Sequence, residues 1–260
     1  MSSIRTNSSL NLFIIMRFCY ALLTTALITA FSSQAAEKPN ILFVLFDDMG
    51  YGEPTSYRPA SLFKTPNIDR MAKEGIRFTD AHSSAASCTP TRYGFLTGRY
   101  PHRIGQFGVL STFSRPLIPK TRLTVASYLK QNGYVTACIG KWHLGMNWNK
   151  QKSKGKNKAK PQLMIGDKMT GGPNEVGFDY FYGFTHARNI KTIIEQDTVV
   201  KEVKPVENQP LMVAKAIEFL KERSLNKEKP FFLYFPMCPP HKPVVPAPQY
   251  VGKGGKVGKG

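Results

Sequence analysis

The chain has 260 residues, of which 42% are hydrophobic, 12% aromatic and 20% charged. This composition provides enough apolar side chains for one sizeable core, which excludes a wholly disordered chain. The 21 glycines and 19 prolines follow no period, which excludes collagen and solenoids, and four cysteines are too few for a disulfide scaffold. A net charge of +19 favours a negatively charged partner or substrate: nucleic acid, an anionic glycan or an anionic membrane.

The amino terminus has the organisation of a secretory signal peptide. Arg5 and Arg17 precede an apolar stretch at residues 18–31, and small residues follow it. The alternative is a membrane anchor, but the apolar run is short for a bilayer span. We expect residues 1–35 to be removed by cleavage after Ala35, to give a secreted or periplasmic protein with no stable membrane insertion.

The remaining residues, 36–260, are expected to form one domain. Loss of Cys19 with the signal peptide leaves Cys88, Cys138 and Cys238. An odd number of cysteines leaves at least one without an internal disulfide partner, and this cysteine needs an explanation. Whether Cys138 and Cys238 pair stays open.

Strand-like and helix-like segments alternate along this domain. The run at 40–46 is continuously apolar, which is typical of a parallel strand covered on both faces. Pro66 suits the first turn of a helix, and Gly75 and Gly133 suit helix ends. Strands are expected at residues 40–46, 76–78, 134–139 and 231–235, and helices at 65–75, 124–132 and 210–220. This alternation predicts an α/β fold with a mostly parallel sheet.

Ionic side chains follow three of these strands. Asp47 and Asp48 end the first, Lys141 and His143 follow the third, and His241 follows the last. Ligands of open α/β sheets bind outside the carboxyl ends of the strands, so the three ends together favour an active site over ordinary polar loops. The two adjacent carboxylates are candidate ligands for calcium or magnesium, although Asp-Asp also occurs in surface turns.

The strongest local motif lies at residues 87–99. Pro90 can open a helix, which places Cys88 beside the positive end of the helix dipole, with Arg92 one turn away. The residues alone are consistent with an activated cysteine, as in a cysteine protease, with an anion site, or with a buried structural thiol.

The sequence from Cys88 to Arg92, followed by Leu96-Thr-Gly-Arg99, resembles the signature of the type I sulfatases, in the arylsulfatase-like branch of the alkaline phosphatase-like superfamily. Further similar segments lie at residues 39–52, 65–69, 140–145, 177–183 and 240–243. The resemblance runs from residue 38 to the end. It implies the sulfatase α/β fold, with helices on both faces of the sheet, and identifies residues 36–260 as the N-terminal part of the catalytic domain, with the sheet incomplete at the C-terminus.

The resemblance also implies a sulfuric ester hydrolase. In that family a separate formylglycine-generating enzyme oxidises the motif cysteine, so Cys88 would become formylglycine (3-oxoalanine), which explains the leftover cysteine. Its hydrated aldehyde would attack the sulfur of a sulfate ester. Asp47, Asp48 and residue 88 would hold a divalent metal, usually calcium, with magnesium possible.

The other landmark residues would take the remaining roles. Arg92 and Lys141 would hold the hydrated aldehyde and the sulfate oxygens. His143 would assist proton transfers of the formylglycine hydroxyl. His241 would contact the substrate near the leaving oxygen as general acid. The substrate would be a sulfated small molecule or glycan.

Two departures from the family pattern affect this hypothesis. The family's further Asp-Asn metal ligands and later lysine are missing from the sequence, so we expect a truncated chain and assign activity to the full-length parent. The alternatives are a related phosphatase or phosphonate monoester hydrolase, an inactive anion-binding module, and a thiol hydrolase.

A basic run at residues 150–160 is interpreted as a solvated loop, with attraction of sulfated polysaccharide as the alternative. Nucleic-acid binding is not expected.

Overall fold

The computed structural model describes residues 38–149 and 162–253. The expected signal peptide and the basic run at 150–160 lie outside these ranges. Among the described residues, no helix has both the length and the apolar character needed to cross a bilayer.

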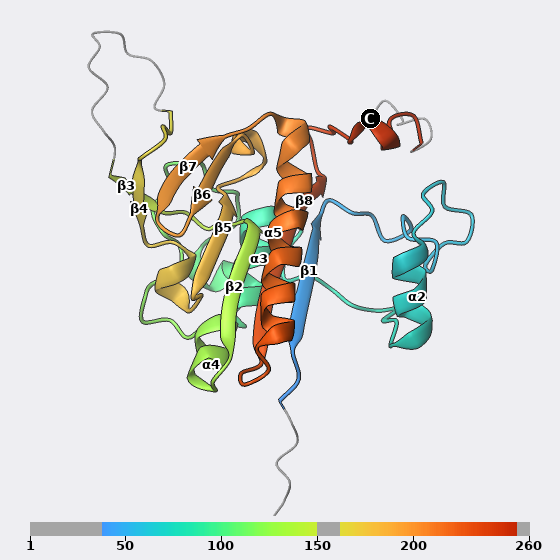
Figure 1. Cartoon of the computed structure of the whole chain (residues 1–260), viewed down its shortest axis with the longest axis horizontal. Helices are drawn as coiled ribbons and strands as arrows, with labels where there is room; N and C mark the ends of the chain where they lie inside the picture. Colours follow the sequence, from blue (N-terminus) through green and yellow to red (C-terminus); the bar gives the residue numbers. More distant parts are fainter. Residues whose placement is uncertain (1–37, 150–161, 254–260) are drawn as a thin grey trace, which may run out of the picture. The chain divides into compact units, whose positions relative to one another are not determined.

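The described residues form one mixed sheet in the order β1-β8-β2-β5-β6-β7-β4-β3 (Figure 1). The first four pair in parallel: β1 (Ile41–Asp47), β8 (Phe231–Pro240), β2 (Val135–Lys141) and β5 (Tyr180–Phe184). The other four extend the sheet by antiparallel pairing: β6 (Thr192–Glu195), β7 (Thr198–Glu202), β4 (Lys168–Thr170) and β3 (Asn147–Asn149). The predicted α/β fold with a mostly parallel sheet is confirmed, and the site-bearing half of the sheet is the parallel half.

Helices cover both faces of this sheet. Alternate side chains of β2 point to opposite sides, as strand geometry requires. Cys138 shares a core with Leu96 of α3 (Cys88–Thr97) and Ala126 of α4 (Val125–Gln131). Ile139 shares the other core with Ala216 of α5 (Pro205–Leu225), which Figure 1 shows in front of β2 and β8.

The remaining helices of residues 38–149 and 162–253 are short. They are α2 (Pro66–Glu74) and four 3-10 turns, η1 (Pro101–Ile104), η2 (Pro173–Val176), η3 (Ala187–Asn189) and η4 (Pro248–Tyr250). The predicted ends of α2 and α4 are confirmed. Thr124 caps α4 by accepting the N–H of Ser127 at 3.0 Å, and Gly133 beyond its end has φ +86°.

Three local predictions are wrong. Residues 76–78 form no strand but an irregular segment, in which Ile76 and Phe78 are exposed rather than packed against a sheet. Strand β1 is not covered on both faces: Leu42 and Val44 are 48% and 39% exposed, because α5 packs chiefly on β8 and β2. Helix α5 begins at Pro205 rather than Pro210, which lies inside it.

Two glycines bring the central strands unusually close together. A Cβ on Gly183 of β5 would lie 1.9 Å from the carbonyl oxygen of Gly140 on β2. A Cβ on Gly140, whose φ is +132°, would lie 2.2 Å from the carbonyl oxygen of Pro236 on β8. Lys141 directly follows Gly140, so the close approach of these strands fixes the point at which the Lys141 side chain leaves the sheet.

Candidate active site

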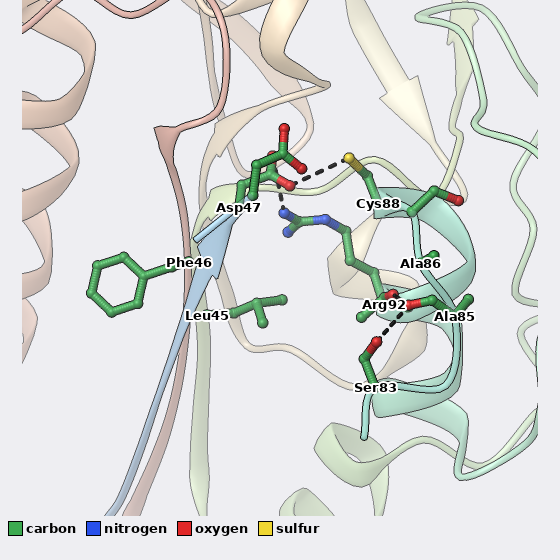
Figure 2. Close-up of a pocket in the computed structure, with 11 residues that line it drawn as sticks. Leu45, Phe46, Asp47, Ser83, Ala85, Ala86, Cys88 and Arg92 are labelled. Carbon is green, nitrogen blue, oxygen red and sulfur yellow. Dashed lines mark hydrogen bonds and ion pairs between the residues drawn. The ribbon is translucent and has the colours of Figure 1, made fainter. Parts of the chain in front are cut away.

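The predicted residues meet at the carboxyl ends of the parallel strands. Asp47 and Lys141 are the last residues of β1 and β2, His241 follows β8, and Cys88 begins α3. Asp47 and Cys88 face a pocket of about 220 Å³ (Figure 2). The pocket is lined by Leu45, Phe46, Asp47, Asp48, Ser83, Ala85, Ala86, Ser87, Cys88, Thr91 and Arg92.

Asp47 is the electrostatic centre of this site. It is 5% exposed, and its Oδ2 accepts a hydrogen bond from Lys141 Nζ and lies 3.6 Å from Arg92 Nη2. Figure 2 shows the Arg92 guanidinium pointing at this carboxylate. Burial opposes ionisation of Asp47, but the charges of Arg92 and Lys141 outweigh it and hold its pKa below the usual range. One buried carboxylate therefore faces two buried cations, which leaves a positive excess.

Cys88 lies beside this cluster. Its Sγ is 3.3 Å from both Asp47 Oδ1 and Lys141 Nζ. Burial raises the pKa of the thiol, and the Asp47 charge adds to that effect against the influence of Lys141. A thiol with a raised pKa carries little thiolate, which argues against the thiol-hydrolase alternative.

Arg92 is built into the floor of the site. It is 1% exposed, and its Nη1 donates to the carbonyl oxygen of Lys141 at 2.8 Å. The guanidinium thus ties α3 to the end of β2 while also facing Asp47.

Thr89 links the motif helix to His143. The Thr89 hydroxyl accepts the N–H of Leu110 at 3.1 Å and donates to the carbonyl oxygen of His143 at 2.8 Å. The carbonyl oxygen of Leu110 lies 2.9 Å from His143 Nε2. Because a carbonyl only accepts, this contact assigns the ring proton to Nε2 and leaves Nδ1 as an acceptor.

The surroundings of His143 keep its ring neutral. Burial, aided by the Lys141 charge, lowers its pKa to about 3. Its Nδ1 is buried and has no hydrogen-bond partner within the described ranges. The residue also holds a φ of +57°, in the left-handed region, which costs on the order of 1 kcal/mol and is common at functional sites.

Asp48 and His241 lie at the outer side of the site. Asp48 has φ +65° and is exposed, and its Oδ2 is 3.7 Å from His241 Nε2. One donor atom each from Asp48, Cys88 and His241 lie within 4.8 Å of one another. Asp47 is likewise within this distance of His241.

The donors available to a metal ion fit an oxygen-ligand site in part. Calcium takes six to eight oxygens, and Asp47 and Asp48 supply carboxylates beside residue 88. The described ranges bring two carboxylates to this position, which is less than a full calcium shell.

Cys138 and Cys238 are both free thiols.

The sequence analysis missed His186. This residue follows β5, is 9% exposed, and its ring centroid lies 5.2 Å from that of His143. Its Nδ1 accepts the N–H of Arg188, so Nε2 carries the proton that is donated to Thr112 Oγ1 at 2.7 Å. Burial, with the charge of Lys141, lowers its pKa to about 4. Recognising β5 as a fourth parallel strand would have placed His186 at the same sheet edge.

Comparison with known proteins agrees with this geometry. A sequence model of the Sulfatase family matches residues 39–258. The N-acetylgalactosamine-6-O-sulfatase of Bacteroides thetaiotaomicron is 28% identical, over 86% of this chain and 52% of that protein. Human steryl-sulfatase is 40% identical, over 61% of this chain and 26% of its own length.

Solved structures show the same fold. One from work on glycosaminoglycan metabolism by Bacteroides thetaiotaomicron has a TM-score of 0.73 at 27% identity, over 85% of this chain and 55% of its own. Another, in complex with its substrate D-glucosamine-2-N,6-O-disulfate, has a TM-score of 0.60 at 30% identity, over 83% of this chain and 37% of its own.

The chain spans about half the length of the N-acetylgalactosamine-6-O-sulfatase and about a quarter of steryl-sulfatase. The match of the family's sequence model nevertheless runs through the whole described domain and includes all the residues gathered at the pocket. On this match and on the shared fold, the chain belongs to the sulfatase family.

Proposed function

We propose that the protein containing this chain hydrolyses sulfate monoesters at the pocket described above. The observation that carries the proposal is the cluster of Asp47, Lys141 and Arg92 beside Cys88. Two buried cations against one carboxylate favour an anionic group at this position, and the family's reaction acts on such a group.

Each side chain has a proposed role that its surroundings support. Residue 88, as formylglycine, would supply a hydrated aldehyde whose hydroxyl attacks sulfur. Lys141 and Arg92 would hold sulfate oxygens. The free Nδ1 of His143 would accept a proton from the hydroxyl of residue 88, and His241 would donate one to the leaving oxygen.

We propose that Asp47, Asp48 and residue 88 hold a calcium ion, with magnesium as the alternative. A divalent cation supplies charge neutralisation and orientation of the sulfate group when bound. Its arrival would also relieve the dependence of Asp47 on Lys141, freeing the ammonium group to contact the substrate.

The proposed substrate is a sulfated sugar or glycan fragment, and a simple aryl sulfate would serve as laboratory substrate. Support comes from the relative named N-acetylgalactosamine-6-O-sulfatase and from the structure solved with D-glucosamine-2-N,6-O-disulfate. The positive net charge of the chain favours such anionic partners. Secretion to the periplasm or beyond, and modification by a formylglycine-generating enzyme, complete the proposal.

The first experiment examines the peptide that contains Cys88, from protein secreted by its native host. Conversion to formylglycine lowers the unhydrated residue mass by about 18 Da and creates a carbonyl that a hydrazide traps. The trapping reaction accompanies the mass spectrum because hydration nearly restores the mass. An alkylatable thiol, in a host shown to modify other such motifs, would overturn the proposed nucleophile.

The second experiment compares an aryl sulfate with an aryl phosphate as substrates of the full-length protein. Sulfate turnover that is removed by a chelator and by Cys88→Ala is expected. A strong preference for the phosphate or a phosphonate would favour a phosphatase or phosphonate monoester hydrolase instead. Absence of any turnover with a trapped aldehyde and metal present would favour an anion-binding module.

A further inference from the structure

A second group of possible metal ligands overlaps the proposed active site. It contains the thiol of Cys238, to which the proposed hydrolysis gives no role. Cys238 lies near the end of β8, and His241 follows three residues later after two prolines. The N–H of His241 donates to the carbonyl oxygen of Cys238 at 3.0 Å, which closes a turn between them. Asp47 lies at the end of the neighbouring strand β1, opposite Pro240 of β8.

The three side chains converge. Cys238 Sγ, a ring nitrogen of His241 and a carboxylate oxygen of Asp47 lie within 4.8 Å of one another. Around a tetrahedral zinc ion, bond lengths of about 2.0–2.3 Å separate ligand atoms by roughly 3.5 Å. Closure by about 1 Å would therefore bring all three donors into the first coordination shell.

The chemistry of this set differs from that of a calcium site. Thiolate, imidazole and carboxylate together suit zinc, whereas calcium selects oxygen donors. Cys238 is 4% exposed and is not in a disulfide. It also lines a second pocket of about 170 Å³ together with His241, and this pocket gives an ion a route to the thiol.

We propose that Cys238, His241 and Asp47 form a site for a thiophilic divalent ion of the zinc class, which shares Asp47 with the oxygen-ligand site but differs from it in its other ligands. Binding replaces the Cys238 S–H bond by an S–metal bond, and the proton leaves to solvent. Burial, with the charge of Asp47, raises the pKa of the Cys238 thiol to about 11 although Lys141 and Arg92 oppose this, so the bond to the ion has to supply the free energy of deprotonation. The site does not depend on formylglycine at residue 88.

Occupation of this site has a consequence for the proposed reaction. Zinc would take His241, the proposed proton donor, and Asp47, the proposed calcium ligand. The site is therefore inhibitory, and loss of Cys238 should relieve zinc inhibition of the full-length enzyme while leaving calcium dependence in place.

Cobalt(II) provides the test, because a thiolate bound to cobalt gives an intense near-ultraviolet charge-transfer absorption that oxygen and nitrogen ligands do not give. The chain carries Cys88→Ala throughout, since the group of Asp48, Cys88 and His241 contains the other available thiol. We expect the absorption to appear with cobalt, and zinc to displace it.

Three variants in this background locate the ligands. Cys238→Ser should abolish the charge-transfer absorption and weaken cobalt binding by at least about tenfold. Cys138→Ser is the matched control, because Cys138 is a fully buried thiol outside the donor group, and it should leave the absorption unchanged. His241→Ala, at a partly exposed position, should weaken binding without disturbing the fold, as checked by circular dichroism.

The outcomes are distinct. Absence of the absorption in the folded Cys88→Ala chain, or its persistence in the folded Cys238→Ser variant, overturns the proposal. An absorption that the unaltered chain shows and Cys88→Ala removes assigns the thiolate to Cys88 and also overturns it. None of these readouts involves sulfate ester turnover, so failure of the proposed function leaves this test unaffected.

Discussion

The hydroxyl of Thr89 joins two backbone groups from separate loops, the N–H of Leu110 and the carbonyl of His143. Leu110 in turn accepts the His143 ring proton, so one buried hydroxyl maintains the orientation and the tautomer of the proposed base. The cysteine motif thus contributes a second residue to the site besides residue 88. The hydroxyl of residue 89 holds His143 in place.

Replacing Thr89 with valine keeps the shape of the side chain but removes the bonds to both backbone partners, the buried carbonyl of His143 and the partly buried N–H of Leu110. We expect Thr89→Val to lower the free energy of unfolding by about 1–3 kcal/mol, measured by urea denaturation, because desolvated groups lose their bonds. Thr89→Ser retains the hydroxyl and should lose less than half as much. Equal losses in the two variants would show that the methyl group, rather than the hydroxyl, matters.

His186 predicts a pH dependence of stability. Its folded-state pKa of about 4 lies below the unfolded value of 6.5. Between these two pH values, His186 is mostly protonated in the unfolded chain and mostly neutral in the folded chain. Stability is therefore full above pH 6.5 and falls as the pH drops towards 4, by up to about 1.4 kcal/mol per pH unit for this proton. His143 adds to this slope in the same direction.

The measurement is the urea midpoint of the chain across this window. His186→Gln should reduce the slope by about one proton and leave the His143 contribution. Asp47, whose pKa is lowered in the folded chain, adds to the slope at the acidic end of the window, and it does so equally in both chains that are compared. An unchanged slope in His186→Gln would contradict the assignment.

At the scale of elements, the close packing of β8, β2 and β5 sets the position of the site. Gly183→Ala would place a methyl group 1.9 Å from the carbonyl oxygen of Gly140 and 3.0 Å from the Phe181 ring. We expect a loss of at least about 3 kcal/mol in the free energy of unfolding, or failure to fold. Gly108→Ala is the control: no atom lies within 4 Å of the added Cβ, so a change within about 0.5 kcal/mol is expected.

The elements also show what the sequence could predict. Asp47, Lys141 and His241 were predicted to converge because an apolar run ending in ionic residues marks a parallel strand's carboxyl end, and the structure brings them together. The N-terminus of α5 was misplaced, since Pro210 looks like a helix start although Pro205 already occupies that position.

Other features were hidden for physical reasons. The antiparallel strands β6 and β7 are short and lack a long apolar run, so their pairing depends on contacts distant in sequence. The exposure of β1 is equally unpredictable, because an apolar strand gives no sign of which neighbours cover it. The Thr89 network joins three separate segments, and residue spacing carries no signal for it.

At the scale of the whole molecule, β1 presents an apolar strand with one partner, β8, among the described residues. Leu42 and Val44 project from it and are 48% and 39% exposed. Edge strands with apolar exposed faces promote association between chains. We expect this chain, studied at its present length, to self-associate in sedimentation velocity experiments.

Leu42→Thr combined with Val44→Thr should reduce that association, since threonine retains the preference for strand while removing apolar surface. Ile76→Thr is the control, because Ile76 is 82% exposed but lies outside any strand. If Ile76→Thr reduces association as strongly, general surface hydrophobicity rather than the β1 edge is responsible.

The pairing of β1 with β8 also determines when the site comes into existence during protein synthesis. Phe231 donates its N–H to Asn40 Oδ1 across 191 positions of the chain. At about 5–20 residues per second, a ribosome needs roughly 10–40 s to make the intervening segment. Throughout that interval Asp47, whose carboxylate contacts Cys88 in the finished site, lacks the strand that positions it. The proposed modification of Cys88 would therefore have a period, before β8 joins the sheet, in which the site around this cysteine is not yet assembled.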